Sequence, residues 1–186
     1  MNLLNYMGHT PLVKLENPYG NNCGNVFVKL EEFNPGGSIK SRVGLNMLLE
    51  AENNGRLKKG KTLIEPTGGN TGIGLAIAAS LRGYKLKLVI PDNFSKEKIM
   101  TLRDYGAEVI LSNHELGNDS HIIKAREIIS ANPEKYICLD QFNNLANPMA
   151  HYMGTGTEIV QEMKYNVDCF VAAIGSGGTI MGVGKN

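Results

Sequence analysis

Short apolar runs alternate with longer amphipathic stretches along the middle of this chain. Residues 86–90 are largely apolar, which predicts a buried strand, and Ser95 caps a predicted helix that ends at Tyr105. The same pattern predicts strands over residues 62–64, 109–111 and 136–139 and a helix over 119–131. Strands that alternate with helices through short turns form a parallel sheet with helices on both faces. The pattern therefore predicts an α/β fold.

A lysine stands in the first turn of another predicted helix. The turn Asn34-Pro35-Gly36-Gly37-Ser38 delivers Lys40 to a helix whose apolar face is formed by Ile39, Val43, Met47, Leu48 and Ala51. A lysine that is partly desolvated at a helix N-terminus has a lowered pKa. Such an amine can act as a nucleophile and form a Schiff base with an aldehyde cofactor. The alternative is a solvated surface lysine.

A second glycine turn has the sequence Glu65-Pro66-Thr67-Gly68-Gly69-Asn70-Thr71-Gly72. It follows the predicted strand over 62–64 and opens a predicted helix over 73–82. The glycines allow the backbone to close on a ligand, and three side chains, those of Thr67, Asn70 and Thr71, add donors. Free N–H groups at a helix start favour an anion, and a carboxylate suits this loop. The alternative is that Asn70 or Thr71 is an ordinary helix cap.

A third turn consists of Gly175-Ser176-Gly177-Gly178-Thr179. The apolar run 169–174 before it predicts a strand buried on both faces, and a helix is predicted from Ile180 onward. Backbone N–H groups and the two hydroxyls would form a nest for a phosphate. Dinucleotide sites use similar loops, but the G-x-G-x-x-G fingerprint followed by an acidic residue is not met.

The order of lysine, carboxylate loop and phosphate loop resembles the fold type II (tryptophan synthase β-like) family of pyridoxal-phosphate enzymes. Within that family the chain is similar to the group of cysteine synthases (O-acetylserine sulfhydrylases) and cystathionine β-synthases. The motifs that carry the resemblance, besides the three turns, are Gly8-His9-Thr10-Pro11-Leu12-Val13, Gln141-Phe142-Asn143-Asn144 and His151-Tyr152 with Gly156 and Glu158-Ile159. The resemblance implies parallel sheets flanked by helices.

The resemblance also implies a role for each motif. Lys40 would bind pyridoxal 5′-phosphate and later move the Cα proton of the substrate, and Asn70 would hydrogen-bond the 3′ oxygen of the cofactor. The residues implied for the substrate carboxylate are Thr67, Gly68, Asn70, Thr71 and Gln141. The residues implied for the cofactor phosphate are Gly175, Ser176, Gly177, Gly178 and Thr179. No metal is implied.

The implied reaction is β-replacement on an activated serine, namely O-acetylserine and sulfide giving cysteine and acetate. The alternative within the group is the condensation of serine with homocysteine. The resemblance further implies a cytoplasmic homodimer. It divides the chain into a small domain over residues 41–140 and part of a large domain, formed by residues 1–40 and 141–186.

Two departures from the family pattern change what is expected. The family usually has a serine where Gly68 stands, so Gly68→Ser is expected to add a donor to the carboxylate, worth roughly 1 kcal/mol. Family members are also much longer than 186 residues. The chain is therefore expected to be a truncated part of a longer enzyme with an incomplete second domain. A catalytically inactive fragment is the alternative function.

The composition argues against a nucleic-acid-binding, membrane-binding or zinc-binding protein. Nineteen basic and 18 acidic residues give no electrostatic reason to expect nucleic acid or a membrane surface as a partner. The three cysteines are too widely spaced for a zinc site or a disulfide framework. Cys138 and Cys169 lie in apolar runs and are expected to be core residues. No apolar run has the length of a transmembrane helix.

Overall fold

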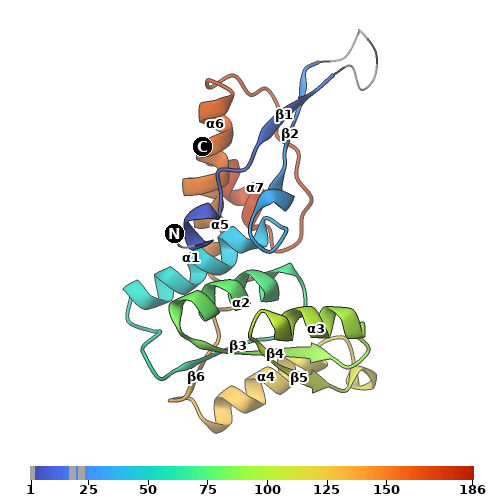
Figure 1. The fold of residues 1–186 in the computed structure, drawn as a ribbon, viewed down its shortest axis with the longest axis vertical. Coiled ribbons are helices and arrows are strands. Elements are labelled where there is room, and N and C mark those ends of the chain that lie inside the picture. Colours follow the sequence, from blue (N-terminus) through green and yellow to red (C-terminus); the bar gives the residue numbers. More distant parts are fainter. Residues whose placement is uncertain (1–2, 17–19, 21–23) are drawn as a thin grey trace.

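A four-stranded parallel sheet forms the lower half of the molecule in Figure 1. The computed structural model describes residues 3–16, 20 and 24–186. The strand order is β5-β4-β3-β6, with β3 at Thr62–Glu65, β4 at Lys85–Pro91, β5 at Glu108–Ser112 and β6 at Tyr136–Ile137. The predicted parallel sheet is confirmed. Strand β6 is shorter than predicted because the backbone N–H groups of Leu139, Asp140 and Gln141 bind the Glu65 carboxylate instead of a neighbouring strand.

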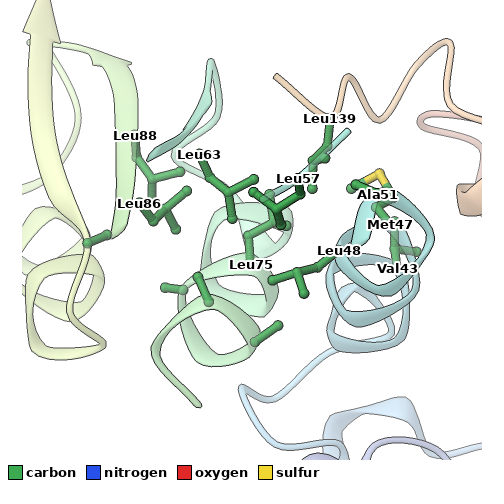
Figure 2. Packing of buried hydrophobic residues seen from close by; sticks show 14 of the residues in the cluster. Val43, Met47, Leu48, Ala51, Leu57, Leu63, Leu75, Leu86, Leu88 and Leu139 are labelled. Carbon is green, nitrogen blue, oxygen red and sulfur yellow. The ribbon is translucent and has the colours of Figure 1, made fainter. Parts of the chain in front are cut away.

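Helices cover both faces of this sheet, as predicted. Helix α4 (Ser120–Ala131) packs on one face, whereas α2 (Asn70–Arg82) and α3 (Lys96–Asp104) lie on the other, with α1 (Lys40–Asn53) packed on α2 (Figure 1). Figure 2 shows the larger core, in which Leu63, Leu86 and Leu88 of the sheet meet Leu75 of α2 and the apolar face of α1. The four α1 residues Val43, Met47, Leu48 and Ala51 are fully buried, which confirms the predicted apolar face.

Helices α1 and α2 cross at two glycines. An ideal Cβ atom at Gly44 would lie 2.6 Å from the carbonyl carbon of Gly74, and one at Gly74 would lie 2.5 Å from the carbonyl oxygen of Lys40. Backbones that approach this closely leave no space for a side chain. The contact therefore places the first turn of α1, which contains Lys40, against the first turns of α2.

The upper half of the molecule is built from both ends of the described chain (Figure 1). An antiparallel hairpin, which the sequence analysis did not predict, consists of β1 (Leu12–Leu15) and β2 (Val26–Lys29). This half also contains the 3-10 turns η1 (Leu3–Tyr6) and η2 (Glu31–Phe33), the helices α5 (Ala146–Ala150), α6 (Thr157–Glu162) and α7 (Gly178–Val183), and the π-helix η4 (His151–Gly156). A further 3-10 turn, η3 (His114–Leu116), lies near the sheet instead.

The strand predicted over residues 169–174 is wrong. This segment has no regular secondary structure, and Val171 and Ile174 are 86% and 75% exposed. An apolar run becomes a buried strand only where another strand supplies hydrogen bonds, and no strand in the described part of the chain pairs with this one. Cys169 is exposed for the same reason, in contrast to the expectation that it is a core residue. No helix among the described residues is long and apolar enough to cross a bilayer.

An ion-pair cluster joins α1 to the upper half. The buried Arg42 guanidinium contacts Glu31 of η2 at 2.8 Å and Glu158 of α6 at 2.6 Å. Glu158 also pairs with Lys29 and accepts the backbone N–H of His9. Burial alone would raise the pKa of Glu158, but the hydrogen bonds from Arg42, His9 and Lys29 lower it to about 2. The cluster fixes the motif that begins at Gly8 beside the helix of Lys40.

We predict that Gly74→Ala destabilises the protein. In an open helix this change would stabilise by about 1 kcal/mol, but here the new Cβ would force α1 and α2 apart at an overpacking cost of roughly 1–3 kcal/mol. Urea unfolding measures the change, with Ser80→Ala on the exposed side of α2 as the control, expected to stay within about 0.5 kcal/mol of the parent. A more stable Gly74→Ala protein would contradict the close helix contact.

Candidate active site

Lys40 is the first residue of α1, and its amine faces the third glycine turn. The turn before it places Gly36 and Gly37 at φ angles of 87° and 73°, a left-handed conformation that favours glycine. The Lys40 Nζ donates to Ser176 Oγ at 3.0 Å, across 136 residues of sequence. Burial lowers the pKa of Lys40, which is the direction expected for a partly desolvated lysine. Lys40 is therefore a half-buried, hydrogen-bonded amine.

A chain of hydrogen bonds leads from Lys40 to the second glycine turn. Ser176 Oγ, which accepts a hydrogen bond from Lys40 Nζ, also accepts one from Asn147 Nδ2 at 2.8 Å. The same Asn147 Nδ2 donates to the carbonyl oxygen of Gln141 at 2.8 Å. The side chain of Gln141 in turn accepts from Thr71 Oγ1 at 2.6 Å. Three motifs that are far apart in the sequence thus meet at one place.

The second glycine turn, which is expected to bind a carboxylate, leads into α2 without a side-chain cap. The cap residue is Gly69, so the alternative that Asn70 or Thr71 is the helix cap is wrong. Asn70 is the first residue of α2 and is exposed, whereas Thr71 is buried with its hydroxyl on Gln141. The Thr67 hydroxyl accepts from the Gly69 backbone N–H at 3.3 Å. The polar side chains of this loop therefore do not cap the N-terminus of α2.

Glu65, at the end of β3, holds Gln141 in place. Its buried carboxylate accepts the backbone N–H groups of Leu139, Asp140 and Gln141 and the thiol of Cys138. Burial raises the pKa of Glu65, and these four donors oppose the rise. Burial and the neighbouring Glu65 also raise the pKa of the Cys138 thiol, so this thiol is protonated at neutral pH and is a poor nucleophile.

The third glycine turn, residues 175–179, which is expected to bind a phosphate, is open on one side and packed on the other. At Gly175 and Gly177 an ideal Cβ would have no atom within 4 Å, whereas at Gly178 it would lie 2.0 Å from Asn147 Oδ1. Thr179 Oγ1 lies 3.4 Å from Nε2 of the fully buried His151. Burial, with the nearby Lys40 and Arg42 cations, lowers the pKa of His151 to about 4. The imidazole is therefore neutral at pH 7.

A comparison with protein-family models matches residues 3–186 to the family described as pyridoxal-phosphate dependent enzyme. The chain belongs to this family. It is 48% identical over 179 residues to cysteine synthase A of Escherichia coli K12, covering 96% of this chain and 54% of that protein. It is 43% identical over 187 residues to cystathionine beta-synthase of Dictyostelium discoideum, covering 99% of this chain and 37% of that protein.

A solved structure gives the same result. The crystal structure of cysteine synthase (OASS) from Entamoeba histolytica superposes with a TM-score of 0.94 at 39% identity, covering 99% of this chain and 55% of that chain. The chain therefore spans about half the length of this structure and of the Escherichia coli relative, and a smaller share of the Dictyostelium protein. The expected fold class, that of fold type II pyridoxal-phosphate enzymes, is confirmed.

The described residues fit the cofactor of this family. A half-buried lysine amine with a lowered pKa suits an aldehyde. It lies beside a glycine turn whose open positions leave backbone N–H groups and the hydroxyls of Ser176 and Thr179 for a phosphate. Pyridoxal phosphate carries both an aldehyde and a phosphate. The roles of the individual site residues remain predictions.

The structure places the expected site residues in two groups. Lys40, Ser176, Gln141 and Thr71 join the hydrogen-bond chain, whereas the Thr179 hydroxyl lies against His151 instead. Thr67, Gly68, Asn70, Gly175, Gly177 and Gly178 lie on the adjoining turns and helix starts. Sequence reasoning missed Asn147 and assigned no partner to His151. No sequence pattern marked Asn147, because α5 is a short helix that the sequence analysis did not predict and the two acceptors of Asn147 lie in distant loops.

The expectation for Gly68 has to be revised. An ideal Cβ at Gly68 would lie 2.5 Å from Phe94 Cε1 and 2.8 Å from Ile90 Cγ2. The Phe94 ring is partly buried against the main core and has Lys98 Nζ 5.5 Å from its centroid. The ring therefore occupies the space that a serine side chain at position 68 needs. Gly68→Ser alone is expected to disturb the loop rather than to supply a donor.

We predict that Gly68→Ser destabilises the protein by roughly 1–3 kcal/mol because the new side chain overpacks against the Phe94 ring. In a Phe94→Ala background the additional cost of Gly68→Ser should fall by at least half, which urea unfolding of the four proteins measures as a double-mutant cycle. Gly69→Ser is the matched control, because its Cβ would have only Thr67 Oγ1 at 3.9 Å. Equal costs in both backgrounds would contradict the ring contact.

Proposed function

We propose that this chain supplies the cofactor lysine and both anion-binding loops of a pyridoxal-phosphate-dependent β-replacement enzyme. The proposed reaction converts O-acetylserine and sulfide into cysteine and acetate. The observation that carries the proposal is the hydrogen-bond chain that joins Lys40, Ser176, Asn147, Gln141 and Thr71. It unites an amine, a phosphate nest and a carboxylate loop in one site, which is what an amino-acid substrate and a phosphorylated aldehyde cofactor require together.

The carboxylate loop orients the substrate. Thr67, Thr71 and the backbone N–H groups at the start of α2 supply donors for an anion, and the positive end of this 13-residue helix favours a carboxylate there. Gln141 adds an amide whose position is set by Glu65 and Thr71. Asn70 is assigned to the 3′ oxygen of the cofactor. Fixing the carboxylate determines which face of the substrate's Cα is presented to Lys40.

The lysine and the phosphate loop serve the cofactor end of the site. The backbone of residues 175–179 and the hydroxyls of Ser176 and Thr179 would hold the phosphate, and Lys40 Nζ would attach to the aldehyde. When bound, pyridoxal phosphate supplies the electron sink that makes the substrate's Cα proton removable. Lys40 Nζ takes that proton, and its lowered pKa favours the neutral amine that a general base must be.

A second candidate uses serine and homocysteine on the same scaffold. The 43% identity to the cystathionine beta-synthase of Dictyostelium discoideum favours it, but the cysteine synthases of Escherichia coli are more similar to this chain at 47–48% identity. The two reactions share the Lys40 chemistry and differ in the nucleophile. A third possibility is that a chain of this length, about half that of the cysteine synthases it matches, is inactive.

The resemblance to the family also leads us to propose a homodimer in the cytoplasm. We retain the proposed division into a smaller domain over residues 41–140 and a part of a larger domain over residues 1–40 and 141–186. The parallel sheet within 62–137 and the separate hairpin, whose Lys29 pairs with Glu158 and Glu162 of α6, support this division (Figure 1). Light scattering of the purified protein measures its assembly state.

We predict that Lys40→Ala abolishes the visible absorbance of bound pyridoxal phosphate and lowers cysteine formation by at least 10²-fold, because the variant has neither the attachment point nor the base. Lys59→Ala, an exposed lysine beyond the same helix, is the control and should behave like the parent. Absorbance after gel filtration and a cysteine assay measure both effects. A Lys40→Ala protein that keeps the absorbance would show that another lysine holds the cofactor.

The products decide between the candidate reactions. Purified protein loaded with cofactor receives O-acetylserine with sulfide in one reaction and serine with homocysteine in the other. Mass spectrometry should find cysteine in the first reaction and little cystathionine in the second. Cystathionine as the main product would favour the second candidate, and the absence of both products from a protein that binds the cofactor would favour the inactive one.

A further inference from the structure

Asn147 is a buried residue of α5 that links two loops of the hydrogen-bond chain. The residue is only 1% exposed, and its Nδ2 atom donates hydrogen bonds to acceptors in two different loops. One acceptor is the carbonyl oxygen of Gln141, beside the proposed carboxylate site, and the other is the hydroxyl of Ser176, in the proposed phosphate nest. Both distances are 2.8 Å.

We infer that Asn147 is a positioning residue that sets the separation between the carboxylate loop and the phosphate loop. This inference rests on the proposed function of the two loops. A planar amide directs its two N–H bonds at a fixed angle, so two acceptors on one Nδ2 atom are held in a fixed relation to each other. The amide thereby fixes the distance between the two proposed anion sites.

The packing around the amide supports this role. Asn147 Oδ1 is buried and has no hydrogen-bond partner among the described residues. A buried polar atom without a partner costs roughly 1–3 kcal/mol, which an apolar side chain of the same size would avoid. Asn147 is therefore a poor choice for packing alone, and the two N–H donations are what the residue contributes.

Gly178 holds the amide against the phosphate loop. An ideal Cβ at position 178 would lie 2.0 Å from Asn147 Oδ1 and 2.6 Å from its Cγ. Only a glycine allows the loop backbone to come this close to the amide. A shift of α5 is thus transmitted to the loop both by the hydrogen bond to Ser176 and by direct contact.

A fixed separation matters for the proposed chemistry. The substrate's carboxylate and the cofactor's phosphate belong to one ligand assembly once both are bound, so the two loops must match its length. Misplacement of reacting groups by about 1 Å can cost 10²-fold in rate. A residue that spans the two loops should therefore affect binding at both ends, although it touches neither ligand.

The test compares Asn147→Ala with Asn143→Ala, a control in the turn before α5 whose exposed side chain donates to Asp140. Affinities are measured for pyridoxal phosphate, for pyridoxal, which has no phosphate, and for O-acetylserine with the loaded protein. Asn147→Ala should weaken pyridoxal phosphate and O-acetylserine about tenfold each, while pyridoxal is little affected, because Lys40 is unchanged. Asn143→Ala should match the parent.

A second variant separates a positioning role from general damage. Ser176→Ala removes the phosphate side of the bridge together with the acceptor of the Lys40 amine and one proposed phosphate donor. It should therefore weaken pyridoxal phosphate and leave O-acetylserine nearly unchanged. In the double variant Asn147→Ala/Ser176→Ala the losses for pyridoxal phosphate should overlap rather than multiply. Parent-like affinities of Asn147→Ala for both ligands, or fully multiplicative losses, would overturn the inference.

A further measurement keeps the inference independent of the proposed function. If the parent protein binds no pyridoxal phosphate, the proposed function fails. The coupling between Asn147 and Ser176 is then measured from the melting temperatures of the unloaded parent, the two single variants and the double variant. Shifts that are smaller in combination than their sum support the bridge, whereas additive shifts overturn it. If Asn147→Ala does not fold, Asn147→Leu, which fills the space without donating, replaces it in the same cycle.

Discussion

The contact between the backbones of α1 and α2 is the constraint on which the rest of the site depends. Gly44 and Gly74 allow the two helices to touch without side chains between them. The carbonyl group of Lys40 lies against Gly74, which is in the second turn of α2. Lys40 is therefore close to the N-terminus of α2, where the proposed carboxylate loop ends. A larger residue at either position would separate the amine from the loop that is proposed to present the substrate.

Charge around the lysine is controlled by pairing and burial. Arg42, two residues after Lys40, has its charge compensated by Glu31 and Glu158, so it does not remain as an unpaired cation beside the amine. His151 is kept neutral by burial. The amine itself has a lowered pKa for the same physical reason. The site therefore combines a charged ion-pair cluster at Arg42 with neutral partners, Ser176 and Asn147, next to the Lys40 amine.

The sequence predicted the local elements well and the contacts between them poorly. The apolar run 86–90, the Ser95 cap and the helix over 119–131 depend on neighbouring residues, and the structure has β4, the capped α3 and α4 there. The run 169–174 looks like a strand, but strand formation depends on a partner elsewhere in the chain, and here the segment is exposed. The same limit explains Asn147 and the Phe94 ring over Gly68, because both act through residues that only the tertiary fold brings near. The glycine turns were informative because a left-handed or close-packed backbone restricts the residue type directly.

Reductive trapping is the most direct test of the central claim, that Lys40 is the amine around which the three motifs assemble. The protein is incubated with pyridoxal phosphate, treated with sodium borohydride to fix the cofactor to the amine that holds it, digested and mapped by mass spectrometry. The structure predicts that the modification lies on the peptide containing Lys40 and that added inorganic phosphate, by competing for the loop 175–179, reduces it. Modification spread over the exposed lysines, with Lys40 no more labelled than the others and no effect of phosphate, would contradict the account.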